Sequence, residues 1–402
     1  MIARHRPPQN LRSLLAALVS GKSLRPSLER IEARYAQLWN VEHVVWIPSA
    51  RFGITHAVRQ HPANLQTVYS AAFNCGAVFH AVRETDRDVR YLDTPPNSFL
   101  MDTARSPGPR AAVILSEMFG QRFSAAQRSQ PLVDEATQRI FDMAMSIPDA
   151  SDFAPLRDQD VAVVSFGLGK SLYAGWGGLA VTSSDVMASR LRAERTNNLS
   201  AAGRLTSLKH DTKVLARMAA HLPLIYGPLR QRKGASTAAT ATFADQPFSR
   251  QTHEWHRSVS PLHALLALDN ADRAQSWAAQ RRTLAERYRT AFADALTPEH
   301  LPAETNDALS HFCLRVPADD RSAIRQQLWQ QGIDAATLFP TPIDLCPVAQ
   351  FPHAHAASGS VLNLPLSTQL TQAHIDRIVR AVRTAVLSVD EGGRAAAERR
   401  AA

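Results

Sequence analysis

The chain has 402 residues, of which 45% are hydrophobic and 20% are charged, a composition ordinary for a soluble globular protein with a sizeable core. The formal net charge is +9, but only five of the 45 basic residues are lysines and no basic run is interleaved with aromatic residues, so a nucleic-acid-binding groove is not indicated. No apolar run approaches the ~18 residues of a membrane-spanning helix, and the three cysteines show no C-x-x-C spacing. We therefore expect a cytoplasmic protein without membrane association, a nucleic-acid partner, a disulfide framework or a metal site.

Short apolar segments alternate with helical ones through the first half of the chain. Residues 28–39 have apolar positions at helical spacing, and a short strand at 44–47 and a helix at 52–59 follow. The alternation predicts a mostly parallel sheet covered by helices on both faces, with a ligand beyond the carboxyl ends of its strands. A further helix is predicted at 76–83, and further strands at 67–69, 89–92, 111–115, 131–133, 161–164 and 179–182.

The second half of the chain predicts a linking helix and a smaller domain. Residues 261–295 are strongly helical in composition, and residues 205–250 before them form a long segment that we interpret as an insertion. We expect four regions: an N-terminal segment at 1–24, a large domain at 25–262, the linking helix with a small C-terminal α+β domain at 263–390, and a disordered tail at 391–402.

One lysine, Lys170, lies among glycines in the stretch SFGLGKSLYAGWGG, directly after the strand predicted at 161–164. A phosphate-binding P-loop is one interpretation, because Gly169 and Ser171 flank the lysine as that motif requires. Against it, Val164 stands where the opening glycine is needed, and three glycines lie where a helix should follow. A solvated loop lysine is a second interpretation.

A third interpretation is a lysine that holds pyridoxal 5'-phosphate as a Schiff base. That chemistry needs a desolvated amine, an anion cup at a helix N-terminus and a carboxylate against the pyridine nitrogen. The sequence offers these groups, each directly after a predicted strand. Ser165 and the turn at 48–53 could form the anion cup, and the acidic pair Asp134 and Glu135 could supply the carboxylate. We therefore favour this interpretation.

The same stretch resembles a known family. Ser165-Phe166, Lys170, Leu172 and the glycines of 175–178 match, without gaps, the S-F-x-x-x-K-x-L-x-x-G-x-G-G element of the DegT-type sugar aminotransferases, which are fold-type I pyridoxal-phosphate enzymes. The resemblance implies a large domain with a mostly parallel seven-stranded sheet, a small C-terminal domain and a homodimer with shared sites. Weaker similarities follow in family order at 28–54, 71–93, 119–120, 133–138 and 362–378.

The resemblance also implies roles for residues of this chain. Lys170 would carry the cofactor, Ser165 would bind its phosphate, and Arg51 stands where the family has the threonine of its phosphate turn. Either Asp134 or Glu135 would pair with the pyridine nitrogen, and we prefer Asp134 because the shorter side chain is usual. The remaining cofactor residues implied are Ser49, Ala50, Gln138, Phe73 and Asn74, of which Phe73 is equally suited to the core.

Substrate contacts are implied at Trp176, which replaces a family glutamate, and at His256 and Arg257, where the family reaches the neighbouring subunit's site. We also expect Arg230 and Arg232 of the insertion to cover an anionic ligand, although a solvated helix face suits them too. The function implied is transfer of an amino group, from glutamate, to a keto group of a nucleotide-linked sugar. Another pyridoxal-phosphate reaction, such as dehydration, and a non-catalytic regulatory role are the alternatives.

Overall fold

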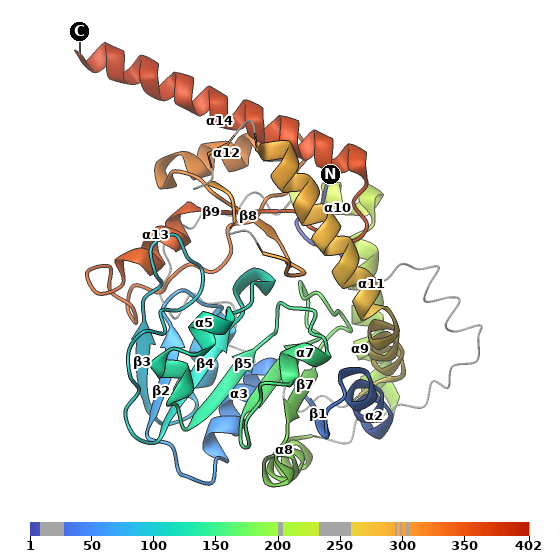
Figure 1. Cartoon of the computed structure of the whole chain (residues 1–402). Coiled ribbons are helices and arrows are strands. Elements are labelled where there is room, and N and C mark those ends of the chain that lie inside the picture. Colours follow the sequence, from blue (N-terminus) through green and yellow to red (C-terminus); the bar gives the residue numbers. More distant parts are fainter. Residues whose placement is uncertain are drawn as a thin grey trace.

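The computed structural model describes residues 1–8, 28–199, 204–232, 259–293, 296–297, 300–302 and 305–401. The fold is α/β, which confirms the predicted class (Figure 1). A seven-stranded sheet forms the centre of the large domain, and a two-stranded sheet belongs to the smaller domain that lies above it in this view.

The large sheet has the strand order β1-β7-β6-β5-β4-β2-β3. Strand β7 is antiparallel to both of its neighbours, whereas the other pairings are parallel. The carboxyl ends of six strands therefore point to one edge, where ligands of such sheets bind. The strands are β1 (His43–Ile47), β2 (Thr67–Ala71), β3 (Asp88–Leu92), β4 (Ala111–Ser116), β5 (Gln138–Asp142), β6 (Val161–Ser165) and β7 (Gly178–Thr182).

Helices cover the sheet on both faces. In β1, Val44 and Trp46 pack into one core, and Val45 and Ile47 pack into the core on the opposite face, because successive side chains of a strand alternate. The first core also contains side chains of α2 (Leu28–Trp39) and α11 (Pro261–Phe292), and the second contains side chains of α3 (Ala50–Arg59), α4 (Gly76–Arg83) and α8 (Asp185–Asn198). Burial on both faces explains why β1, β6 and β7 appear in the sequence as apolar runs.

The strand predicted at 131–133 is wrong. That segment is the short helix α6 (Pro131–Asp134), whose first residue is a proline, a position where the missing N–H has no intrahelical partner to lose. The strand of this region is β5, which begins at Gln138. This strand is hard to recognise in the sequence because it begins with polar residues. Arg139 is buried in the structure beside Asp160, to whose Oδ2 its Nε donates at 2.7 Å.

The smaller domain has a core of its own. Strands β8 (Phe312–Arg315) and β9 (Val361–Leu364) pair antiparallel, and the long helix α11 runs from the large domain toward them (Figure 1). Helices α12 (Ala318–Gln330), α13 (Pro352–Ser360) and α14 (Gln372–Ala401) belong to this part of the chain. The sequence predicted disorder at 391–402, whereas α14 continues to Ala401. The boundaries of the four regions stay a prediction.

The described part of the predicted insertion forms two helices, α9 (Arg204–Ala220) and α10 (Pro223–Gln231). Helix α10 is joined to the small domain through Asp334, whose carboxylate accepts a hydrogen bond from the Tyr226 hydroxyl at 2.5 Å and from Arg230 Nε at 3.0 Å. The N-terminal segment reaches the same carboxylate, because Arg4 Nη2 donates to it at 2.6 Å. Three distant segments of the chain therefore meet at one buried aspartate.

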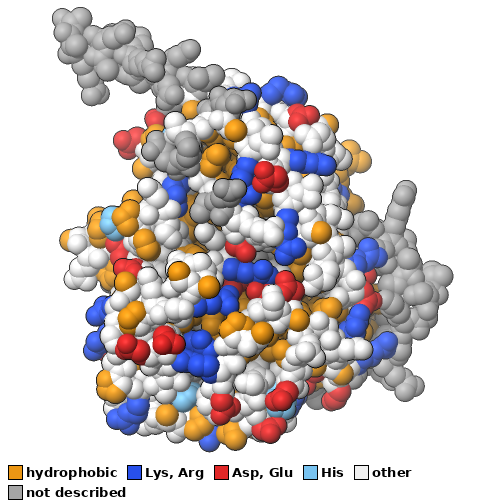
Figure 2. Space-filling model, in the orientation of Figure 1, with side chains coloured by type: hydrophobic (Ala, Val, Ile, Leu, Met, Phe, Trp, Pro, Cys, Tyr) orange, Lys and Arg blue, Asp and Glu red, His pale blue; other side chains and the backbone are white. Residues whose placement is uncertain are grey.

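The surface shows mixed charge. On the face in Figure 2, Lys and Arg side chains are interspersed with Asp and Glu rather than gathered into one basic area. Among the helices of the described residues, none is both long and apolar enough to cross a membrane. The remaining short helices are η1 (Met118–Gly120), α5 (Ala125–Arg128) and α7 (Ala150–Phe153).

Candidate active site

A cavity of about 350 Å³ lies at the edge where the parallel strands end. It is lined by Ser49 after β1, Cys75 after β2, Asp142 at the end of β5 and Ser165 at the end of β6. Lys170, from the loop between β6 and β7, lines it as well. The fold thus gathers a lysine, a carboxylate and two hydroxyls from segments far apart in the sequence.

The first wall of the cavity is the N-terminus of α3. Ser49 caps this helix, because its Oγ accepts a hydrogen bond from the N–H of Phe52 at 3.1 Å. The N–H groups of Ala50 and Arg51 precede the first intrahelical hydrogen bonds, so the helix end attracts an anion. All three predicted residues, Ser49, Ala50 and Arg51, line the cavity. The charge of Arg51 also acts on α4. The pKa of His80, a residue of that helix, is lowered first by burial and second by the Arg51 guanidinium.

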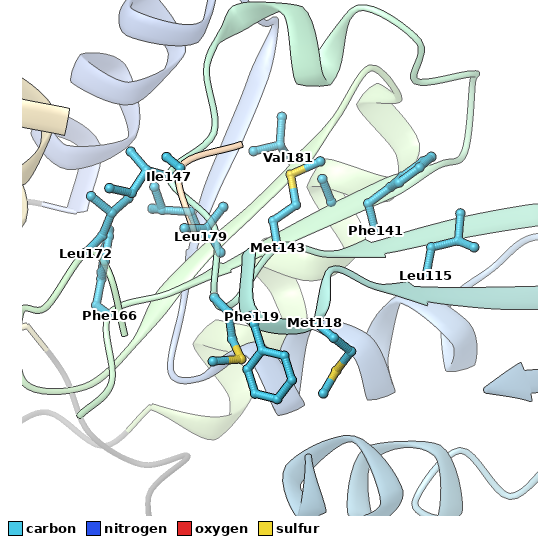
Figure 3. Close-up of a cluster of buried hydrophobic side chains, with 14 of the residues drawn as sticks. Leu115, Met118, Phe119, Phe141, Met143, Ile147, Phe166, Leu172, Leu179 and Val181 are labelled. Atoms are coloured by element: carbon cyan, nitrogen blue, oxygen red, sulfur yellow. The ribbon is translucent and has the colours of Figure 1, made fainter. Parts of the chain in front are cut away.

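The second wall is the lysine loop. Its backbone folds on itself, since the N–H of Phe166 donates to the Gly177 carbonyl and the N–H of Ala174 donates to the Phe166 carbonyl, both at 2.9 Å. Phe166 and Leu172 enter the core of the large domain (Figure 3). These anchors leave Lys170 half-buried on the cavity side of the loop. Beside it, Ser165 Oγ accepts from the N–H of Gly167 at 3.3 Å.

The third wall carries Asp142, a site residue that the sequence prediction missed. Its Oδ2 accepts from the Ser116 hydroxyl at 3.2 Å, and its Oδ1 accepts from the N–H of Ala144 at 3.1 Å. Burial raises the pKa of Asp142, and the nearby Lys170 ammonium acts against that rise. Asn74, a predicted cofactor residue, contacts Asp142 indirectly through Ser116, because its Nδ2 donates to Ser116 Oγ at 2.9 Å.

The acidic pair predicted for this place lies elsewhere. Asp134 and Glu135 are exposed at the end of α6 and do not line the cavity. Gln138 is buried at the opposite end of β5, where its Nε2 donates to the carbonyls of Ala57 and Gln159 at 3.3 and 3.0 Å. The sequence prediction ended a strand at residue 133 and so placed residues 134–138 at the cavity. In the structure the strand of this region begins at Gln138 and ends at Asp142, so it is Asp142 that reaches the cavity. The signal available in the sequence was an aspartate directly after the apolar pair at 140–141.

Phe73, another of the cofactor residues that the resemblance implied, does not line the cavity. Phe73 is fully buried and packs against Phe99 and Phe119, with ring centroids 5.6 and 6.1 Å apart. It serves the core, and Cys75 lines the cavity in its place. Burial raises the pKa of the Cys75 thiol, so this side chain behaves as a small neutral wall residue.

Trp176, predicted to contact substrate, lines the cavity. Its ring lies between two histidines, stacked on His263 with centroids 4.7 Å apart and edge-on to His210 at 5.3 Å. The tautomer of His263 is fixed, because Nε2 accepts from Trp46 Nε1 and Nδ1 faces the Ala174 carbonyl. Burial lowers the pKa of His263 to about 4, so a neutral, rigid support holds this indole.

The remaining predicted substrate residues divide into two groups. His256 and Arg257 lie outside the described residues. Arg230 is held by Asp334, and neither Arg230 nor Arg232 lines the lysine cavity. Among the described residues of the insertion, Arg217 of α9 is the arginine that lines it, and no pattern in the sequence distinguishes Arg217 from the other arginines.

A family model matches residues 9–383 of this chain, and its description is the DegT/DnrJ/EryC1/StrS aminotransferase family. The chain belongs to this family. The resemblance seen in the lysine stretch is thereby confirmed, and it extends to nearly the whole chain.

Two curated relatives match part of the chain. The erythromycin biosynthesis sensory transduction protein EryC1 of Saccharopolyspora erythraea is 29% identical over 145 residues, which are 33% of this chain and 39% of that protein. The dTDP-3-amino-3,4,6-trideoxy-alpha-D-glucose transaminase of Streptomyces venezuelae is 27% identical over 156 residues, 36% of this chain and 41% of that protein. Both alignments thus span less than half of each relative's length.

Solved structures resemble the whole fold. A putative sugar aminotransferase from Streptococcus pneumoniae in its PMP form has a TM-score of 0.70 and 17% identity, with 96% of this chain and 99% of that chain covered. DesV of S. venezuelae has a TM-score of 0.67 and 20% identity, with 93% of each chain covered. These likenesses confirm the fold-type I architecture.

Proposed function

We propose that this protein is a pyridoxal-phosphate-dependent aminotransferase that acts on a sugar. The observation that carries the proposal is the meeting of Lys170, Asp142 and the N-terminus of α3 around one cavity. Membership in an aminotransferase family supports it, as does the PMP form of the S. pneumoniae neighbour.

The donor set of the cavity fits this cofactor. A phosphate suits the first-turn N–H groups of Ala50 and Arg51 with the hydroxyls of Ser49 and Ser165. A pyridine nitrogen suits Asp142, a buried carboxylate with neutral hydrogen-bond donors and one lysine nearby. Lys170 would hold the aldehyde carbon. Pyridoxal phosphate supplies an electron sink for negative charge on the substrate carbon.

The residues of the chain would divide the remaining work. Lys170 Nζ would take a proton from the substrate carbon and return it on the cofactor side, as a general acid–base group. Asp142, kept in place through Ser116 and Asn74, would hold positive charge on the ring nitrogen. Trp176 would limit the substrate side of the cavity and exclude water. We expect glutamate as the amino donor and a keto group of a nucleotide-linked sugar as the acceptor, since S. venezuelae has a relative described as a dTDP-amino-sugar transaminase.

The proposal includes assembly and location. We expect a cytoplasmic homodimer in which His256 and Arg257 reach the site of the neighbouring subunit, so that each cavity is completed by two chains. Sedimentation at micromolar concentration tests this, and a fully active monomer would refute it.

The decisive experiment is to label the protein after incubation with pyridoxal phosphate. Borohydride reduction should attach the cofactor to the peptide that contains Lys170, and not to peptides with Lys22, Lys209, Lys213 or Lys233. Glutamate should then convert the bound cofactor to its amine form and release 2-oxoglutarate. A labelled protein that no amino donor converts would favour another reaction on the same cofactor, and an unlabelled protein would favour a regulatory role.

A further inference from the structure

Helix α9 of the insertion covers one side of the lysine cavity. Val214 packs so closely on Gly175 that a Cβ added there would lie 2.5 Å from Val214 Cγ2. Gly175 also has a φ of +100°, so both space and backbone conformation require glycine at this point of the lysine loop. On the same helix, His210 lies edge-on to Trp176, and Asp211 accepts a hydrogen bond from Ser260 at the start of α11.

This packing directs Arg217 into the cavity. His210, Val214 and Arg217 are four and three residues apart, which places them on one face of a helix, and that face meets the lysine loop. Arg217 lines the cavity together with Lys170 and Arg51, and it is an exposed residue. It lies near the buried Tyr173, since burial raises the pKa of that phenol to about 12 and the Arg217 charge opposes the rise.

The guanidinium of Arg217 is available to a ligand. Among the described residues, no carboxylate forms an ion pair with it, in contrast to Arg230 on the neighbouring helix α10. Arg51 and the N-terminus of α3 already offer an anion site in this cavity, whereas Arg217 belongs to another element, α9. A second cation in the cavity, from another element, therefore suits a further anionic group on a substrate whose reacting end lies at Lys170.

We propose that Arg217 binds a phosphate of the acceptor substrate and so makes the insertion a specificity element for a nucleoside diphosphate-linked sugar. This inference rests on the proposed function, because the acceptor is the substrate with a phosphate far from its reacting carbon. A guanidinium matches phosphate oxygens with two parallel hydrogen bonds, which an ammonium group cannot do.

The test is a titration of the full-length protein loaded with pyridoxal phosphate. Thymidine diphosphate, uridine diphosphate and inorganic pyrophosphate are titrated by calorimetry into the natural protein and into R217A, R217K and K213A. Lys213 is the matched control, since it is an exposed cation of the same helix that does not line the cavity. We expect R217A to weaken nucleoside diphosphate binding about tenfold or more, R217K to restore part of it, and K213A to leave it unchanged.

Two further measurements separate the sources of an effect. The affinity for the cofactor, followed by absorbance, should be equal in all four proteins. Rising salt concentration should reduce the difference in nucleoside diphosphate affinity between the natural protein and R217A. The proposal is overturned if R217A weakens cofactor or glutamate instead, if it changes no phosphate titration, or if the natural protein binds none of the three probes. Failure of transamination would show separately, as absence of 2-oxoglutarate in the glutamate reaction, while the titrations still decide the role of Arg217.

Discussion

Two buried aspartates of this protein have opposite surroundings. Asp334 is surrounded by its own partners, the guanidinium groups of Arg4 and Arg230 and the hydroxyl of Tyr226. In the part of the chain that the structure describes, the direct donors to the Asp142 carboxylate are one hydroxyl and one backbone N–H. Although burial acts to raise both pKa values, the partners of Asp334 hold its pKa below the usual value, whereas that of Asp142 stays raised.

The difference separates a structural carboxylate from one suited to a ligand. A buried charge that the chain itself neutralises ties segments together, as Asp334 ties the N-terminal segment, α10 and the small domain. A buried charge left with weak partners costs stability, and such groups concentrate at functional sites. The two aspartates therefore predict opposite results on substitution.

The largest effect is expected at Asp142. Replacement by asparagine removes the negative charge opposite the cofactor ring, and transamination should fall about 100- to 1,000-fold, as for other preorganised electrostatic groups. The thermal midpoint Tm of the cofactor-free protein should be unchanged or raised, because a poorly compensated buried charge is lost. Steady-state rates and calorimetric Tm measure both. A D142N protein with undiminished rate would place the ring carboxylate elsewhere.

The reverse is expected at Asp334. Replacement by asparagine leaves the half-buried guanidinium groups of Arg4 and Arg230 without the buried carboxylate that neutralises them, so the free energy of unfolding should fall by about 3 to 5 kcal/mol. Urea unfolding measures this, with the exposed Asp158 changed to asparagine as the control. Cofactor binding by the folded fraction should persist, because Asp334 does not line the lysine cavity. A D334N protein as stable as its control would show that the cluster contributes nothing net.

The pH dependence of these two substitutions sharpens the comparison. The lowered pKa of Asp334 means that its stabilisation is present above the unfolded value of 3.8 and is lost as the pH falls through the folded value. The raised pKa of Asp142 means that its destabilisation is full above the folded value and disappears as the pH falls toward 3.8. The free energy of unfolding is measured for the natural protein, D334N and D142N, all without cofactor, from pH 7 to acid. At pH 7 we expect D334N to be less stable than the natural protein and D142N to be more stable. Both differences should disappear as the pH falls and the two aspartates become protonated. Differences of equal sign would contradict the assignment.

The sequence predicted much of the fold and part of the site for identifiable reasons. Strands buried on both faces appear as apolar runs, so β1, β6 and β7 were predicted with nearly correct bounds. Strand β5 was missed because the buried Arg139 is neutralised by Asp160, a partner that is distant in the sequence and becomes a neighbour only in the folded protein. That single error moved the expected carboxylate from Asp142 to residues 134 and 135. Arg217 could not be predicted, since its place depends on how α9 packs against the lysine loop.

The smallest expected effect tests that error directly. Asp134 and Glu135 lie exposed at the end of α6, and the hydrogen bond from the Ser106 hydroxyl to Glu135 joins two exposed groups. Exposed side chains of this kind change the free energy of unfolding by no more than about 0.5 kcal/mol. The variants D134N and E135Q should therefore match the natural protein in stability, cofactor affinity and rate, whereas D142N, the same chemical change at a buried position, should lose activity. If D134N or E135Q lost cofactor instead, the strand-end position of Asp142 would be coincidental and the ring nitrogen would have to face α6.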